Sequence, residues 1–264
     1  MIKLLKNAEK QKSHVFLRLF SFLLMIIFTS FIVLFNVFNN DGVMAIACGY
    51  AVRRVPIYRV ERNDKLIAIS FDCAWGNEYT QKLLEQMEFY NVKSTFFMVS
   101  FWAEKYPEDV KKIVERGHEI GTHSKTHSHM SKLTAEAVNA ELTYSKKVIE
   151  DISGSSVELF RAPFGEYNNQ LIECAEQFGL FTIQWDVDSL DWKDLSAQEI
   201  ATRVISSVKS GSIILCHNNG KHTAESLPLI FADLIAKGYK FVKISDLIYK
   251  NGYVMMSDGT QVKQ

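Results

Sequence analysis

Short apolar segments of strand length alternate with helical segments over most of this 264-residue chain. Glycines end several of the helical segments, among them Gly117, Gly179 and Gly238. The predicted strands cover residues 66–71, 94–99, 118–122, 158–161, 180–185, 212–216 and 239–244. The predicted helices cover residues 78–90, 107–116, 134–152, 168–178, 196–209 and 223–237. This alternation predicts an α/β fold in which helices cover a parallel sheet.

Seven such strands fit two architectures, a doubly wound open sheet and a closed (β/α) barrel. The first predicted strand is not followed by a glycine-rich phosphate-binding loop, so the sequence gives little support to a nucleotide-binding fold. Lys and Arg together number 30, as do Asp and Glu. Because the charges balance, we expect no nucleic-acid partner.

An uncharged apolar segment, Leu19 to Phe38, precedes the alternating pattern. About 20 apolar residues form a helix of roughly 30 Å, enough to span the core of a bilayer. Basic residues precede this segment, namely Lys3, Lys6, Lys10, Lys12 and Arg18. We therefore expect a single-pass membrane anchor with the α/β domain outside the cytoplasm. A cleaved signal peptide and a secreted protein are the alternative, because small residues resembling a cleavage site follow at Ala45–Cys48.

These patterns divide the chain into five parts. We expect a basic cytoplasmic stub at 1–18, a transmembrane signal-anchor at 19–38, a linker at 39–64, the α/β domain at 65–250 and a C-terminal tail at 251–264.

Reactive side chains follow five of the predicted strands. They are Asp72 and Cys73 after the first strand, His123 and His127 after the third, Arg161 after the fourth, Asp191 and Trp192 after the fifth, and His217 after the sixth. In a parallel barrel the carboxyl ends of the strands share one face, and active sites are built there. We therefore expect these side chains to form one site.

The two histidines of "HSKTH" are spaced at i and i+4. On a helical turn His123 and His127 would face the same way, so the spacing predicts that both bind one metal ion.

Five short motifs occur in a recognisable order: "SFDCAWG", "HSKTH", "RAPFG", "DSLDW" and "LCH". They resemble the five motifs of the NodB-type polysaccharide deacetylases, carbohydrate esterase family 4, and the resemblance extends over residues 66–249. The first motif resembles that of the sporulation-associated, membrane-anchored PdaB-like group. The resemblance implies a distorted (β/α)7 barrel, which agrees with the seven predicted strands, and it makes residues 65–250 a polysaccharide deacetylase domain.

The resemblance also implies a role for each motif residue. Asp72 is implied as the general base, with Arg161 pairing with it and orienting it. His217 is implied as the general acid, held by Asp191. His123 and His127 are implied as metal ligands. The implied substrate-binding residues are Phe164, Trp192 and Leu215.

The implied reaction is hydrolysis of N-acetyl groups on a cell-wall polysaccharide, such as the N-acetylated sugars of peptidoglycan. An amide carbonyl is a poor electrophile, so a metal ion that polarises it and acidifies an attacking water assists the reaction. A carboxylate beside that water accepts its proton, and a histidine protonates the leaving amine near neutral pH. An arginine beside the base keeps the base ionised.

Cys73 departs from the resemblance, because the family places a second aspartate there as the third metal ligand. Three interpretations remain open. Cys73 binds zinc as a thiolate; two histidines hold the metal with water or substrate; or the protein is a membrane-tethered glycan-binding protein with little or no activity. We expect the site to bind a divalent metal ion. If His123, His127 and Cys73 are its ligands, the predicted metal is zinc.

Overall fold

The computed structural model describes residues 20–33 and 52–264. It contains two compact units, Met1–Arg53 and Arg54–Gln264. In the first unit, residues 20–33 form a helix. Within residues 20–33 and 52–264, no helix combines the length and the apolar character needed to cross a membrane. Leu19 and residues 34–38 of the predicted anchor lie outside the described residues.

The second unit is an α/β domain built on a curled parallel sheet. Its strands are β2 (Leu66–Cys73), β3 (Thr95–Met98), β4 (Glu119–Thr122), β5 (Leu159–Phe160), β6 (Phe181–Thr182), β7 (Val187–Asp188), β8 (Ile213–His217) and β9 (Lys240–Phe241). They follow the order β6-β5-β4-β3-β2-β8-β7, and β9 pairs with β2. Every pairing is parallel. The α/β fold predicted from the alternating pattern is confirmed.

The two edge strands of the sheet, β6 and β7, follow each other in the chain. No ladder joins them in the part of the chain that the structure describes. The segment between them bonds elsewhere instead: Ile183 forms an isolated bridge with Ile57, and the Asp186 N–H donates to the Ile213 carbonyl in β8. The sheet is therefore a half-barrel, which is the distorted form of the (β/α)7 type.

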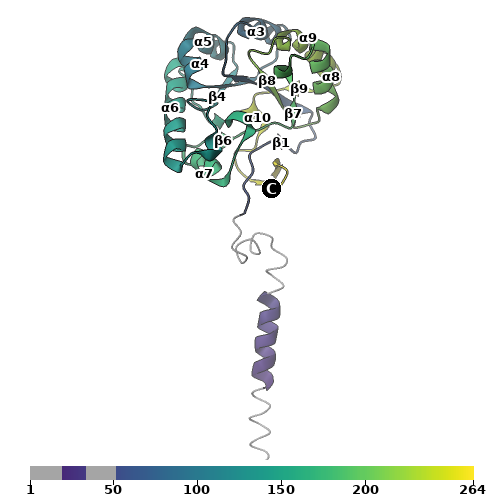
Figure 1. The fold of residues 1–264 in the computed structure, drawn as a ribbon. Helices are drawn as coiled ribbons and strands as arrows, with labels where there is room; N and C mark the ends of the chain where they lie inside the picture. The colour runs from purple at the N-terminus through teal and green to yellow at the C-terminus, as the bar shows by residue number, and fades with distance from the viewer. Residues whose placement is uncertain (1–19, 34–51) are drawn as a thin grey trace, which may run out of the picture. The chain divides into compact units, whose positions relative to one another are not determined.

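Helices surround this sheet (Figure 1). They are α3 (Thr80–Phe89), α4 (Ser100–Lys105), α5 (Pro107–Glu115), α6 (Ala135–Ser153), α7 (Asn169–Gln177), α8 (Ala197–Ser207), α9 (Thr223–Ala236) and the short α10 (Ile244–Leu247). Three 3-10 turns complete the connections: η1 (Met130–Lys132), η2 (Pro163–Gly165) and η3 (Asp191–Lys193).

Both ends of the domain carry strands that the sequence pattern does not predict. They are β1 (Arg59–Val60), β10 (Tyr253–Met255) and β11 (Thr260–Lys263). β10 and β11 pair antiparallel, and β1 pairs parallel with β11. Parts of the expected linker and of the expected tail thus form a small three-stranded sheet.

Alternation along β2 separates two kinds of side chain. Ile67, Ile69, Phe71 and Cys73 belong to the larger apolar core, which the sheet shares with the helices. Ala68 belongs to the smaller core inside the curled sheet. Successive strand residues point to opposite faces, so Asp72 shares the inner face with Ala68. The inner face is tightly filled: a Cβ atom at Gly121 would lie 2.7 Å from the Phe97 ring.

Candidate active site

The predicted catalytic side chains meet where the parallel strands end. Asp72 near the end of β2 is the registered neighbour of His217 at the end of β8. His123 directly follows β4 and Arg161 directly follows β5. Because these strands are parallel and adjacent, their carboxyl ends bring the four side chains to one edge of the sheet.

Asp72 and Arg161 form a buried ion pair. Arg161 Nη1 donates to Asp72 Oδ1 at 2.8 Å, and Arg161 Nη2 donates to the Gln184 carbonyl at 3.2 Å. The guanidinium also lies 4.1 Å above the Phe97 ring centroid. Burial alone would raise the pKa of Asp72, but the charge of Arg161 is the main cause that holds that pKa below its ordinary value. Asp72 is therefore a carboxylate at neutral pH, as a general base must be.

His217 is held by Asp191 through two bonds. The His217 Nδ1–H donates to Asp191 Oδ1 at 2.7 Å, and the His217 backbone N–H donates to Oδ2 at 2.7 Å. Burial alone would lower the pKa of His217, but the hydrogen bond and charge of Asp191 raise it above its ordinary value. Since Nδ1 is occupied, Nε2 is the nitrogen left to exchange a proton with a substrate.

Thr223 and Gly220 complete the surroundings of Asp191, and no motif in the sequence marks either residue. Thr223 Oγ1 donates to Asp191 Oδ2 at 2.7 Å. A Cβ atom at Gly220 would lie 2.1 Å from Thr223 Oγ1 and 2.9 Å from Asp191 Oδ2. Only glycine fits this close approach, so Gly220 lets the Thr223 bond form.

His123 and His127 lie side by side, with ring centroids 5.0 Å apart. The His123 Nδ1–H donates to the Arg161 carbonyl at 2.8 Å, which leaves Nε2 unprotonated and 3.5 Å from Asp72 Oδ2. Burial lowers the pKa of both rings, and that of His127 falls to about 4. A histidine that binds a metal ion is usually neutral, and its other ring nitrogen donates a hydrogen bond to a carbonyl or carboxylate oxygen.

A loop, not a helical turn, brings these two rings together, so the helical expectation was wrong. Ser124 and His127 both adopt positive φ, at 75° and 55°. The His127 backbone N–H donates to Ser124 Oγ at 2.9 Å and closes the loop. Residues in this left-handed region are strained, so the surroundings must hold them.

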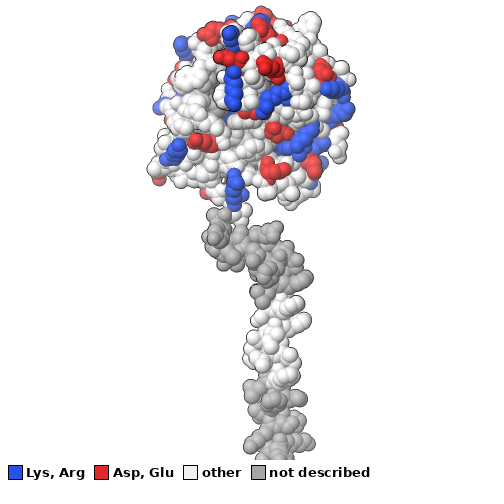
Figure 2. Space-filling view, turned by 45° about the vertical axis from the view of Figure 1, so that its right-hand side comes forward, with Lys and Arg blue, Asp and Glu red and all other residues white. Residues whose placement is uncertain are grey.

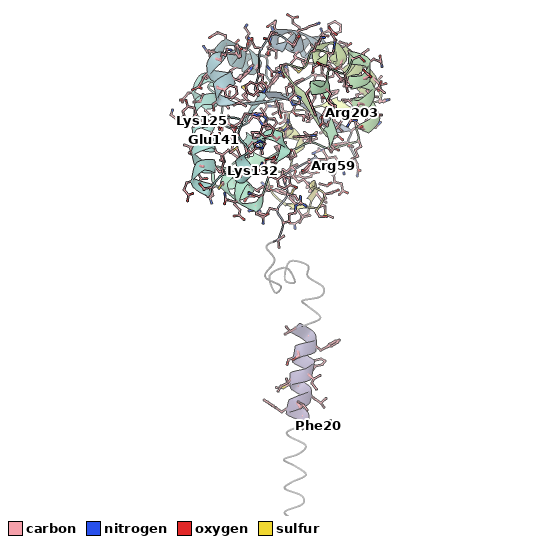
Figure 3. The ribbon with its side chains drawn as sticks, in the orientation of Figure 1. Phe20, Arg59, Lys125, Lys132, Glu141 and Arg203 are labelled. Carbon is pink, nitrogen blue, oxygen red and sulfur yellow. The ribbon has the colours of Figure 1, made fainter. Side chains whose placement is uncertain are left out.

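Glu141 of α6 supplies that support. Its Oε2 accepts from the backbone N–H groups of Lys125 and Thr126, both at 2.9 Å, and its Oε1 accepts from Thr126 Oγ1 at 2.8 Å. Figure 3 shows Glu141 and Lys125 next to each other beside α6. In the sequence, Glu141 is one of several acidic residues on a charged helix, and nothing marked it as a partner of the histidine loop.

Cys73 does not complete a metal site, which corrects the expected ligand set of His123, His127 and Cys73. Its side chain is buried in the apolar core on the helix-covered face, with Sγ 3.8 Å from the Phe71 carbonyl. Burial, and then the charge of Asp72, raise the pKa of the Cys73 thiol well above its ordinary value. Among the residues that the structure describes, no three or more His, Cys, Asp or Glu side chains are arranged to hold a metal ion. The two imidazoles suit a metal, but position 73 does not.

The expected substrate-binding residues lie around the catalytic side chains in different environments. Leu215 in β8 is buried, at 3% exposure, whereas Trp192 in η3 and Phe164 in η2 are 57% and 55% exposed. Phe164 has a φ of 63°, a conformation that is rare for a residue other than glycine. The charges around the domain are mixed: on the face shown in Figure 2, basic and acidic side chains are interspersed.

Comparison with known proteins points to one family. The family model described as polysaccharide deacetylase matches residues 59–183. A peptidoglycan-N-acetylglucosamine deacetylase of Bacillus cereus (strain ATCC 14579) is 33% identical over 209 residues, which cover 77% of this chain and 95% of that protein. The uncharacterized protein YlxY of Bacillus subtilis (strain 168) is 34% identical over 193 residues, which cover 73% of this chain and 60% of YlxY.

Among solved structures, the wild-type BA3943 of Bacillus anthracis superposes with a TM-score of 0.71 at 33% identity. The match covers 73% of this chain and 68% of that chain. BA3943 is described as a CE4 family pseudoenzyme, and a mutant of it is described as having restored enzymatic activity.

Proposed function

Because the chain belongs to the polysaccharide deacetylase family, we propose that it hydrolyses the N-acetyl groups of a cell-wall glycan, in particular those of N-acetylated peptidoglycan sugars. One observation carries this proposal: a carboxylate held ionised by Arg161 and a histidine held by Asp191 lie on neighbouring strands. The B. cereus relative named as a peptidoglycan-N-acetylglucosamine deacetylase supports the choice of substrate.

In the proposed reaction, Asp72 accepts a proton from a water molecule as the water oxygen attacks the amide carbonyl carbon. The carbon–nitrogen bond then breaks, and His217 Nε2 donates a proton to the leaving amine. The products are acetate and a free amino sugar. Arg161 keeps Asp72 able to accept the proton, and Asp191 keeps His217 protonated to a higher pH. No step is assigned to a metal ion, because position 73 does not supply the third ligand.

The second candidate function is glycan binding with little or no turnover, and Cys73 is the observation that favours it. A buried thiol stands at the position where the family places an aspartate, and the similar BA3943 is described as a pseudoenzyme. The rest of the site favours turnover, because binding alone does not need an ionised base and a protonated acid.

Acetate release from N-acetylated peptidoglycan, measured with and without added zinc, separates the two candidates. The proposed function predicts release by the wild-type chain. Cys73→Asp provides the comparison: if only this variant releases acetate and binds zinc, the wild-type chain is the glycan-binding protein.

Membrane attachment and a role in spore formation are also proposals. The uncharged segment Leu19–Phe38 supports a single-pass anchor with the domain outside the cytoplasm, and the first motif supports membership of the PdaB-like group. Under this proposal residues 1–18 are cytoplasmic and residues 39–53 connect the anchor to the domain, which begins at Arg54 and not at residue 65 as expected. Full-length protein in the membrane fraction, with the domain open to external protease, is the expected result. A soluble form that begins near Cys48 would overturn the anchor.

A further inference from the structure

A continuous row of aromatic rings borders the candidate active site. Phe101 contacts Trp75 at 5.3 Å between ring centroids, and Trp75 contacts His127 at 5.9 Å. His127 contacts Phe164 at 4.7 Å, and Phe164 stacks on His129 at 4.3 Å. These five rings, called the aromatic row from here on, come from the segments that follow β2, β3, β4 and β5.

Two of the three hydrophobic side chains of the aromatic row are open to solvent. Trp75 is 58% exposed and Phe164 is 55% exposed. By contrast Trp102, the residue directly after Phe101, is 1% exposed within the core. Large exposed aromatic side chains that are joined by a shared ring contact and border a candidate catalytic site mark a binding surface.

Hydrogen bonds hold the backbone at Trp75 in place. The carbonyl of the next residue, Gly76, accepts from Trp102 Nε1 at 2.6 Å and from Asn218 Nδ2 at 2.9 Å. Gly76 itself has a φ of 56°, which suits glycine. Trp75 therefore projects from a loop that is fixed from two sides. A surface that is already ordered loses little freedom when a ligand binds.

The backbone at Phe164 is likewise unusual, since its φ of 63° costs conformational free energy. That conformation places the exposed Phe164 ring between His127 and His129. Beyond it, His129 Nδ1 lies 3.0 Å from Glu166 Oε2, which also accepts from Ser131 Oγ. The end of the aromatic row thus offers polar groups beside an apolar face.

Sugar rings match this surface, because each presents apolar C–H groups on its face and hydroxyl groups at its edge. The aromatic row extends over several ring-to-ring steps and so exceeds one sugar unit. We propose that the aromatic row binds the sugar rings that flank the reacting N-acetyl sugar, which makes the protein selective for an extended glycan over a short one. This inference rests on the proposed function.

Binding of N-acetylglucosamine oligomers, from dimer to pentamer, tests the proposal. The full-length chain carrying Asp72→Asn is titrated by calorimetry, so that turnover does not interfere. Affinity should rise with oligomer length. Adding Trp75→Ala should weaken pentamer binding by about tenfold and flatten the dependence on length. Trp75→Tyr keeps an aromatic face and should restore most of the affinity.

Phe89→Ala is the matched control, because Phe89 is 81% exposed on α3 and lies outside the aromatic row. It should leave all affinities unchanged. If the parent binds the pentamer and Trp75→Ala binds it equally well, the aromatic row is not the binding surface, although the proposed function stands. If the parent binds no oligomer or glycan strand, the proposed function fails together with this inference.

Discussion

Replacing Glu141 should loosen the loop that carries His127. Glu141→Ala removes three hydrogen bonds, two of them from backbone N–H groups. A hydrogen bond to a charged group contributes about 1.5–3 kcal/mol. Thr126 is exposed, so water replaces part of what is lost. We therefore expect the free energy of unfolding to fall by about 2–3 kcal/mol in total, not by that amount for each bond.

Glu141→Gln should be much milder. Its amide oxygen still accepts from the two backbone N–H groups, and its amide nitrogen donates to the Thr126 hydroxyl, so we expect a loss of about 0.5–1 kcal/mol. Urea unfolding followed by circular dichroism measures these differences. Acetate release should fall in Glu141→Ala and recover in Glu141→Gln, because the histidine loop depends on the bonds and not on the charge.

Asp151→Ala is the control on the same helix. Asp151 forms an exposed pair with Lys147, and such pairs contribute about 0–1 kcal/mol. If Glu141→Ala is no less stable than Asp151→Ala, the carboxylate does not hold the loop and the reasoning is refuted.

Two further predictions concern the charged pairs. Arg161→Met should lower the free energy of unfolding by about 3–5 kcal/mol, because it leaves Asp72 buried without its partner. Adding Asp72→Asn should recover part of this loss, as measured by urea unfolding. If nothing is recovered, Arg161 and Asp72 do not stabilise the fold as a pair. The wild-type rate should fall at low pH as Asp72, whose pKa is depressed, becomes protonated, and at high pH as His217, whose pKa is raised, loses its proton. Asp191→Asn should move the alkaline limb of the pH–rate profile to lower pH. If this limb does not move, Asp191 does not raise the pKa of His217 in the active enzyme.

The same charged groups link stability to pH. Because the pKa of Asp72 is lowered by folding, its contribution is present above the pKa of the unfolded chain and is lost as pH falls through the folded value. Because the pKa of His217 is raised, its contribution is present below the unfolded pKa and is lost as pH rises through the folded value. Asp72 and His217 together therefore stabilise the fold most at a pH above the pKa of Asp72 in the unfolded chain and below the pKa of His217 in the unfolded chain.

Local patterns were sufficient to predict most of the α/β domain. The strand 66–71 and the helix 107–116 differ from β2 and α5 by one or two residues at an end. The small sheet was not predictable in this way, because it joins Arg59 to Thr260 across almost the whole domain. β7 was missed because only two residues pair there, a few residues after another two-residue strand, β6.

The side chains proposed as catalytic were located by their positions after predicted strands, but several of their partners were not. Side-chain alternation places Cys216 opposite His217, and Cys216 does lie in the core. The same rule applied to β2 places Cys73 opposite Asp72, yet Cys73 was assigned from the motif instead. The role of Glu141 could not be predicted from the sequence for another reason. It depends on a contact between α6 and a loop, and no local sequence pattern predicts that contact.

Acetate release by Asp72→Asn and His217→Ala, compared with the wild-type chain on N-acetylated peptidoglycan, tests the central claim most directly. Loss of a general base or acid lowers rates by about 10²–10⁴-fold. We predict a loss of this size in each variant while the circular dichroism spectrum stays that of the folded protein. Variants that release acetate as fast as the wild-type chain would contradict the assignment of Asp72 and His217 as base and acid.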